Sequence, residues 1–128
     1  MVTATAKLKN LAISARKVRL VADMIRGKKL ADARDILTFT MKGCAEPMNK
    51  LLASAAANAD EAAAQKHERI DTDAMVVSMI RVDEGRTQRR FQAGPRGRAM
   101  RVRKRSSHVE LMLTGEEKKK AGSGVKKN

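Results

Sequence analysis

A run of twenty residues, 86–105, constrains this chain most, because it contains nine Lys or Arg residues and no Asp or Glu. Such a segment has too few apolar side chains to enter a hydrophobic core. The 128-residue chain has a formal net charge of +14, so most of its excess charge lies here. A positive field of this size predicts a polyanionic partner. Eight of the nine cations are Arg, whose planar guanidinium suits bidentate phosphate contacts, and this favours nucleic acid over an anionic membrane.

The remaining charge is also polarised along the chain. Residues 7–29 carry eight cations and one acid, whereas residues 30–85 carry six cations and ten acids. Two basic segments therefore flank a mildly acidic middle. The single Cys44 suits a reducing cytoplasm, and no apolar stretch is long enough to span a bilayer or to act as a secretory signal. We expect a cytoplasmic protein without a membrane segment.

Helical periodicity appears three times in the first half of the chain. Ser14 precedes Val18, Val21, Ala22 and Ile25 at helical spacing, and Gly27 follows, which predicts a helix with a Ser N-cap and a Gly C-terminal signal. A projection of this helix places Arg16, Arg19 and Arg26 on the side away from the apolar stripe. A short second helix is expected over residues 30–39. A third is expected to start near Pro47 and to end after Asn58, with residues 60–73 either frayed helix or loop.

The second half of the chain changes to strand-forming residues over 75–82 and 109–113. A hairpin centred on Gly94-Pro95 would pair them, with Met79 opposite Val109, Val77 opposite Leu111 and Met75 opposite Leu113. Ser78 and Ile80 would then lie on the other, more polar face. Three helices covering the apolar face predict an α+β fold, with a small antiparallel sheet from which a long basic β-hairpin extends. We expect one domain over residues 1–113, with the arm at 83–107, and a disordered basic tail at 114–128.

Catalytic and metal-binding patterns are weak in this sequence. His67 and His108 have no Cys at ligand spacing, so they are interpreted as a surface and a sheet histidine, and no metal is expected. Cys44 is interpreted as a small buried hydrophobic residue. The segment Gly94-Pro95-Arg96-Gly97 lacks the residues of a phosphate-binding loop. We therefore predict that the protein is not an enzyme and uses no cofactor.

Several motifs resemble the bacterial large-subunit ribosomal protein family L twenty-two. They run in order from about Ala6 to Leu113: Ser14-Ala15-Arg16-Lys17-Val18-Arg19-Leu20-Val21-Ala22-Asp23-Met24-Ile25-Arg26-Gly27-Lys28, Ser54-Ala55-Ala56-Ala57-Asn58-Ala59-Asp60, Val82-Asp83-Glu84-Gly85, Gly97-Arg98-Ala99 and Lys104-Arg105-Ser106-Ser107-His108-Val109. The chain departs from the family pattern at Arg86, where Pro is usual, and at Ala93-Gly94-Pro95, where the family has Pro-Arg-Ala.

The resemblance implies a structural constituent of the large ribosomal subunit that binds 23S rRNA and supports assembly. It also implies that the hairpin tip lines the nascent-polypeptide exit tunnel, where family changes are associated with macrolide resistance. Its partners would be 23S rRNA, neighbouring large-subunit proteins and the nascent chain, with no small-molecule substrate. Predicted rRNA contacts are Lys7, Lys9, Arg16, Lys17, Arg19, Arg26, Lys28, Arg86, Arg89, Arg90, Arg96, Arg98, Arg101, Arg103, Lys104, Arg105, Ser107 and His108, and predicted tunnel-tip residues are Phe91, Gln92, Ala93, Gly94, Pro95 and Arg96.

Two alternatives to this interpretation are a nucleic-acid-binding protein with a different target and a protein of a different class, an enzyme. An architectural DNA-bending protein could also use a basic β-arm with Pro at its tip, but it would normally dimerise through a long apolar helix. An RNA-modifying enzyme would need a nucleophile or an acid/base pair in a pocket, and the sequence shows neither.

Overall fold

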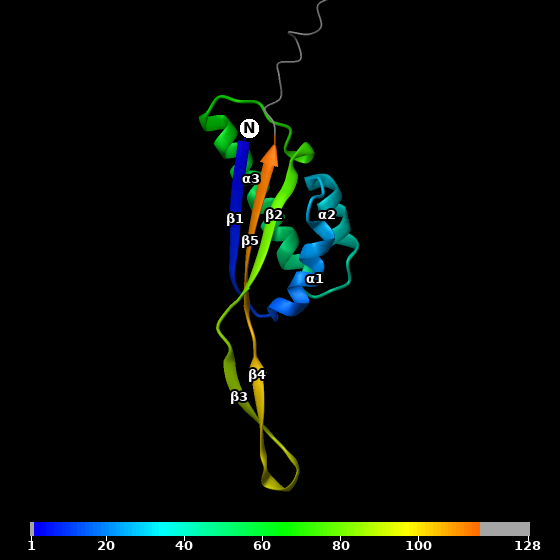
Figure 1. Cartoon of the computed structure of the whole chain (residues 1–128), viewed down its shortest axis with the longest axis vertical. Coiled ribbons are helices and arrows are strands. Elements are labelled where there is room, and N and C mark those ends of the chain that lie inside the picture. Colours follow the sequence, from blue (N-terminus) through cyan, green and yellow to red (C-terminus); the bar gives the residue numbers. More distant parts are fainter. Residues whose placement is uncertain (1, 116–128) are drawn as a thin grey trace, which may run out of the picture.

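The computed structural model describes residues 2–115 and confirms the predicted α+β fold. In chain order the elements are β1 (Val2–Leu11), α1 (Ala15–Ile25), α2 (Leu30–Phe39), α3 (Ala45–Gln65), β2 (Val76–Glu84), β3 (Gln88–Ala93), β4 (Ala99–Lys104) and β5 (Ser107–Gly115). The three helices cover one face of an antiparallel sheet with strand order β1-β5-β2. Strands β3 and β4 form a separate two-stranded ribbon that extends away from this body (Figure 1). We call residues 85–106 the arm.

The three predicted helices are all present. Ser14 occupies the N-cap position of α1, although its side chain makes no capping hydrogen bond, and Gly27 just beyond the helix has a φ of 78°. A residue with a side chain would be strained in that left-handed conformation. Helix α3 agrees with the prediction: Pro47 lies inside its first turn, and the helix ends after Asn58, at Gln65. The first part of the ambiguous segment 60–73 is therefore helical.

Strand β1 was not predicted from the sequence. Its core-facing residues Val2, Ala4 and Ala6 are buried and alternate with exposed polar residues. Two of these three are Ala, which has little strand preference, so the alternation gave a weak signal. The small side chains instead allow β1 to pack closely on α3, where the Asn58 side-chain amide donates to the Thr5 carbonyl at 2.9 Å.

The predicted register between β2 and β5 is wrong. Val77 pairs with Leu113 and Val82 pairs with Val109, and the register shifts between Val77 and Met79. This bulge at Ser78 inverts the alternation of the strand, because one inserted residue moves every later side chain to the other face. Ile80 and Val82 therefore enter the core, at 3% and 6% exposure, in place of Met79.

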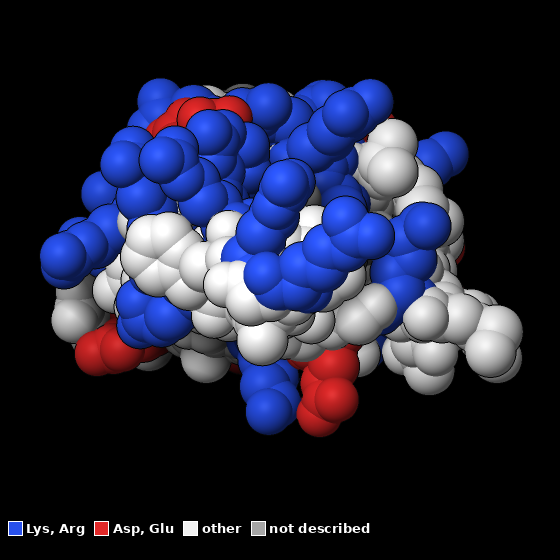
Figure 2. Space-filling model, turned by 90° about the horizontal axis from the view of Figure 1, so that it is seen from below, with Lys and Arg blue, Asp and Glu red and all other residues white. Residues whose placement is uncertain are grey.

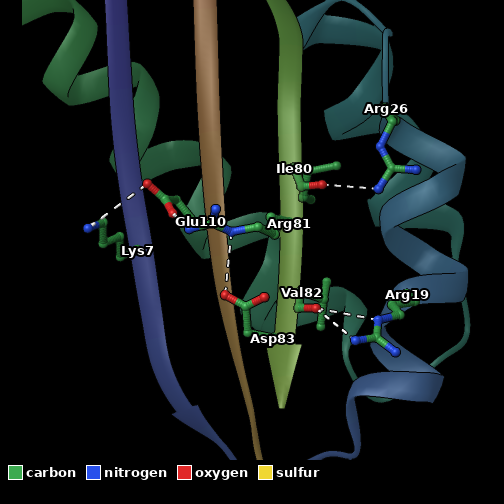
Figure 3. Close-up of polar contacts among 8 residues, drawn as sticks. All are labelled: Lys7, Arg19, Arg26, Ile80, Arg81, Val82, Asp83 and Glu110. Carbon is green, nitrogen blue, oxygen red and sulfur yellow. Dashed lines mark hydrogen bonds and ion pairs between the residues drawn. The ribbon is translucent and has the colours of Figure 1, made fainter. Parts of the chain in front are cut away.

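Helix α1 covers the outer edge of β2. The turn after α1 pairs with the start of the strand, with Gly27 donating to the Val77 carbonyl and Val77 donating to the Lys28 carbonyl, both at 2.9 Å. Further along, the Arg26 guanidinium donates to the Ile80 carbonyl at 3.0 Å, and Arg19 donates to the Val82 carbonyl at 3.1 Å (Figure 3). The prediction that these two arginines point away from the buried stripe is wrong, because they border it and reach the strand.

The boundaries of the domain differ slightly from prediction. Strand β5 continues through Thr114 and Gly115, which pair with Thr3 and Val2, so these residues belong to the sheet rather than to a tail. The remainder of the predicted tail, residues 116–128, lies outside the described residues. Asp83, Glu84 and Ser107, expected in the arm, belong to the body sheet, where Asp83 pairs with His108 and Glu84 with Ser107.

The close packing of α3 on the sheet predicts that larger side chains are not tolerated there. Ala59 is fully buried, so Ala59→Leu should lower the free energy of unfolding by about 1–3 kcal/mol through overpacking. Ala57→Leu places the same side chain at an exposed position of the same helix and should change stability by less than about 0.5 kcal/mol. Denaturant unfolding of both variants measures the difference, and equal stability would contradict the packing described.

The covered edge of β2 predicts a structural role for Arg19. Arg19→Ala removes the donor from the Val82 carbonyl and should lower the free energy of unfolding by about 1 kcal/mol. Arg16→Ala is the matched control, because Arg16 is an exposed arginine of the same helix with no side-chain hydrogen bond within residues 2–115. Thermal unfolding without RNA should separate the two variants. If they unfold alike, the edge contact contributes nothing to stability.

Candidate nucleic-acid interface

The arm is a regular antiparallel ribbon that presents its cations to solvent. The ladder runs from Gln88 opposite Lys104 to Ala93 opposite Ala99. All nine cations of residues 86–105 are exposed. Within the described part of the chain, none of them forms an ion pair with a carboxylate. The positive charge of the arm is therefore not neutralised by the protein itself.

The tip of the arm is a five-residue connection rather than a turn centred on Gly94-Pro95. Gly94 donates to the Arg98 carbonyl at 2.6 Å, and Pro95–Gly97 form a short 3-10 turn between them. Arg96 and Gly97 both have positive φ, at 59° and 71°, which reverses the chain two residues later than predicted. Of the predicted tip residues, Phe91, Gln92 and Ala93 lie in the paired end of β3, whereas Gly94, Pro95 and Arg96 lie in the connection.

The junction between body and arm is tightly packed around Gly85. Its amide donates to the Ser106 carbonyl at 2.9 Å, and the Ser106 hydroxyl donates to the Arg86 carbonyl at 2.6 Å. A Cβ at Gly85 would lie 2.6 Å from the Ser106 hydroxyl oxygen and 3.1 Å from His108 Cε1. A side chain at Gly85 would therefore have to displace the Ser106 hydroxyl, which is held by the Arg86 carbonyl. His108 also has a structural role, since its Nδ1 accepts a hydrogen bond from the backbone N–H of Asn10 at 3.1 Å.

A basic cleft lies between the start of α1 and the base of the arm. Its volume is about 960 Å³, and five cations line it without any acidic residue: Lys17, Arg86, Arg103, Lys104 and Arg105. Asn10, Ser14, Gln88 and Ser106 add polar groups. Figure 2 looks at the arm end of the molecule and shows Lys and Arg over much of that face, with few acidic residues. The fold thus brings together the two basic segments that the sequence separates.

A smaller depression of about 400 Å³ lies beside the same junction. It contains Arg16, Arg19 and Arg105, together with Glu84. Arg105 lines both hollows, so basic side chains surround the base of the arm. Asn10 is the main cleft residue that sequence reasoning missed, because its position became visible only with β1.

Other predicted contacts lie outside these hollows. Lys7 and Lys9 are on β1, and Arg26 and Lys28 are at the opposite end of α1 from the cleft. Ser107 is fully buried, so the prediction that its side chain contacts RNA is wrong. The alternation of β5 explains the burial, because Ser107 faces the core together with Val109, Leu111 and Leu113.

The open face of the sheet carries a balanced set of charges. Arg81 contacts Glu110 across the strands and Asp83 along its own strand, and Lys7 Nζ lies 4.0 Å from Glu110 (Figure 3). Two cations and two carboxylates neutralise one another here, so this face does not attract a polyanion as the arm end does.

Residues 2–115 contain no group of His, Cys, Asp and Glu able to hold a metal ion. Cys44 is buried, and burial raises the pKa of its thiol, which keeps it protonated and a poor nucleophile at neutral pH. No helix in the described range is long and apolar enough to cross a membrane.

Comparison with known proteins identifies the family. Residues 6–114 match the family model for ribosomal protein L22p/L17e. A large ribosomal subunit protein uL22 from Desulfitobacterium hafniense (strain Y51) is 46% identical over 113 residues, which cover 88% of this chain and 95% of the relative. A protein of the same name from Anaeromyxobacter sp. (strain K) is 45% identical over 108 residues, or 84% of this chain and 71% of the relative. The chain therefore belongs to the ribosomal protein L22p/L17e family, whose members are structural components of the ribosome rather than enzymes.

Proposed function

We propose that this protein is a structural component of the large ribosomal subunit in the cytoplasm, where it binds 23S rRNA through the basic cleft and the arm. Its similarity to proteins named large ribosomal subunit protein uL22 supports this assignment. The observation that carries the RNA-binding part is the cleft itself, in which five cations converge without a neutralising acid. The ribosomal relatives favour this proposal over a DNA-bending protein.

The shape of the interface suits a folded RNA. Phosphate groups on a compact RNA surface can enter the cleft beside α1 while others follow the arm, because cations continue along both strands of the ribbon. The arm gains little order from apolar packing, since all six residues of β3 are exposed. RNA contacts would neutralise the repulsion between its cations, and in this way the arm would support rRNA assembly.

The tip supports a second role at a distance from the body. The roughly ten residues from Gly85 to Pro95 span about 30 Å at ~3.4 Å per residue. An arm of this length can pass through rRNA and reach an internal surface. We propose that Gly94, Pro95 and Arg96 contribute to the wall of the polypeptide exit tunnel, where the nascent chain would be a further partner beside neighbouring large-subunit proteins.

The charge of the arm predicts a salt-dependent affinity for large-subunit rRNA. Replacing Arg101, Arg103 and Arg105 together with Ala should reduce the log-log salt slope by roughly two to three, because each lost phosphate contact removes about 0.7–0.9 from it. Filter binding of purified 23S rRNA over a range of salt concentrations measures the slope. The same variant should also comigrate poorly with large subunits during sedimentation of a cell lysate.

A charge-matched variant provides the control. Lys50, Lys66 and Arg69 lie on α3 or the following loop, outside both hollows, and their joint replacement with Ala removes the same formal charge. This control should keep the wild-type slope and sediment with large subunits. An unchanged slope in the arm variant would refute phosphate binding by the arm, and comigration of the wild type with the nucleoid would favour DNA.

The arm consists of the paired strands β3 and β4 and the connection at its tip, and we expect these two parts to have separate functions. Replacing residues 93–99 with Asn-Gly joins the paired Gln92 and Met100 by a two-residue hairpin turn. This change removes the tip and keeps the pairing register of β3 and β4. Large subunits should still assemble, whereas macrolide sensitivity or the passage of nascent chains should change. Loss of assembly in this variant, with normal assembly in the arm triple variant, would show that the two roles are assigned to the wrong parts of the arm.

A further inference from the structure

Phe91 is an exposed aromatic residue in the middle of the basic ribbon. Its side chain is 73% exposed, and it is one of only two aromatic residues in the chain, the other being Phe39 on α2. A large apolar ring on a segment without a core gains nothing from packing in the protein alone. Phe91 also lies within the ladder of β3 and β4, not in the turn, so its position on the ribbon is fixed by pairing.

The strand register surrounds Phe91 with arginines on one side and small residues on the other. Arg101 is directly opposite Phe91, and Arg89 and Arg103 form the next pair on the same face toward the body. Toward the tip, the next pair on this face is Ala93 with Ala99. The ring is therefore bordered by three cations and by two methyl groups, which leave its tip side uncrowded.

A depression lies against this part of the ribbon. It has a volume of about 320 Å³ and is lined by three consecutive residues of each strand, Arg89 to Phe91 and Arg101 to Arg103. Arg90 is held along β3, where its guanidinium donates to the Arg89 carbonyl and the Gln88 side chain. Within residues 2–115, the guanidinium groups of Arg89, Arg101 and Arg103 make no hydrogen bond or ion pair of their own.

We propose that Phe91 is a stacking platform for one unstacked base of the bound RNA, with Arg89, Arg101 and Arg103 binding the phosphates beside that base. This inference rests on the proposed rRNA-binding function and names the chemistry of one site within it. A nucleotide matches both parts of the site, because its base stacks on an aromatic ring while its phosphate accepts from guanidinium groups. An apolar protein surface would cover the ring but would remove three cations from water without neutralising them.

The absence of Trp and Tyr from the chain makes a direct test possible. Phe91→Trp introduces a single fluorophore at the proposed platform, and Phe39→Trp introduces one at the other aromatic position, which is 83% exposed on the body. Each full-length variant is titrated with a short oligouridylate, whose bases stack weakly on one another, and with an abasic oligonucleotide carrying the same number of phosphates.

If the base stacks on residue 91, Trp fluorescence should be quenched only when the strand carries bases and the Trp is at position 91. The oligouridylate should quench the Phe91→Trp variant, and the abasic strand should leave its emission unchanged although it binds the same cations. The Phe39→Trp variant should respond to neither. Equal responses to both strands, or no response to either at concentrations that saturate binding, would overturn the proposal and leave phosphate contacts alone.

A second experiment separates this proposal from RNA binding itself. Phe91→Leu keeps an apolar side chain but removes the ring, so affinity for 23S rRNA should fall about five- to one-hundred-fold while the salt slope stays at the wild-type value. Phe91→Trp should retain affinity. If Phe91→Leu binds like the wild type but the arm triple variant shows a shallower slope, only the stacking site is refuted. If neither Phe91→Leu nor the arm triple variant differs from the wild type in affinity or in salt slope, the proposed rRNA contact by the arm is refuted as well.

Discussion

The pairing of β2 with β5 is the interaction on which the rest of the structure depends. These two strands, together with β1, supply the core face that the helices cover, and both continue directly into the arm as β3 and β4. The arm has no apolar core, so its strand directions are set by this pairing and by the Gly85–Ser106 contact at the junction. A change in the body sheet would therefore alter the direction of a ribbon whose tip lies far from it.

Helix α1 contributes both to the stability of the fold and to the basic cleft. Its inner stripe packs in the core, and Arg19 and Arg26 satisfy carbonyls along the edge of β2, which would otherwise be exposed to pairing with another chain. Its first turn meanwhile supplies Lys17 to the basic cleft. A basic residue of this helix therefore need not be an RNA contact, and the structure shows which ones already have a partner in the protein.

The helices and the arm could be predicted from the sequence because their signals are local. Apolar spacing and Gly27 define α1, and the uninterrupted cations of residues 86–105 exclude that segment from the core. Strand β1 was missed because Ala4 and Ala6 serve close packing on α3, and the register failed because the bulge at Ser78 has no local signature. The cleft depends on β1 and on the direction of the arm, so it could not be derived from charge counts alone, although its cations were identified.

The placement of acidic residues determines which side of the molecule has unneutralised positive charge. Glu110 and Asp83 neutralise Lys7 and Arg81 on the open face of the sheet, whereas the cations of the cleft and arm have no such partners among residues 2–115. The field is therefore directed toward the arm end, even though cations occur over the whole body. Charge alone would allow the arm to bind RNA in many registers. If Phe91 stacks on a base as proposed, a ring fixed in the ribbon between Arg101 and the small pair Ala93 and Ala99 would set the register in which the arm binds.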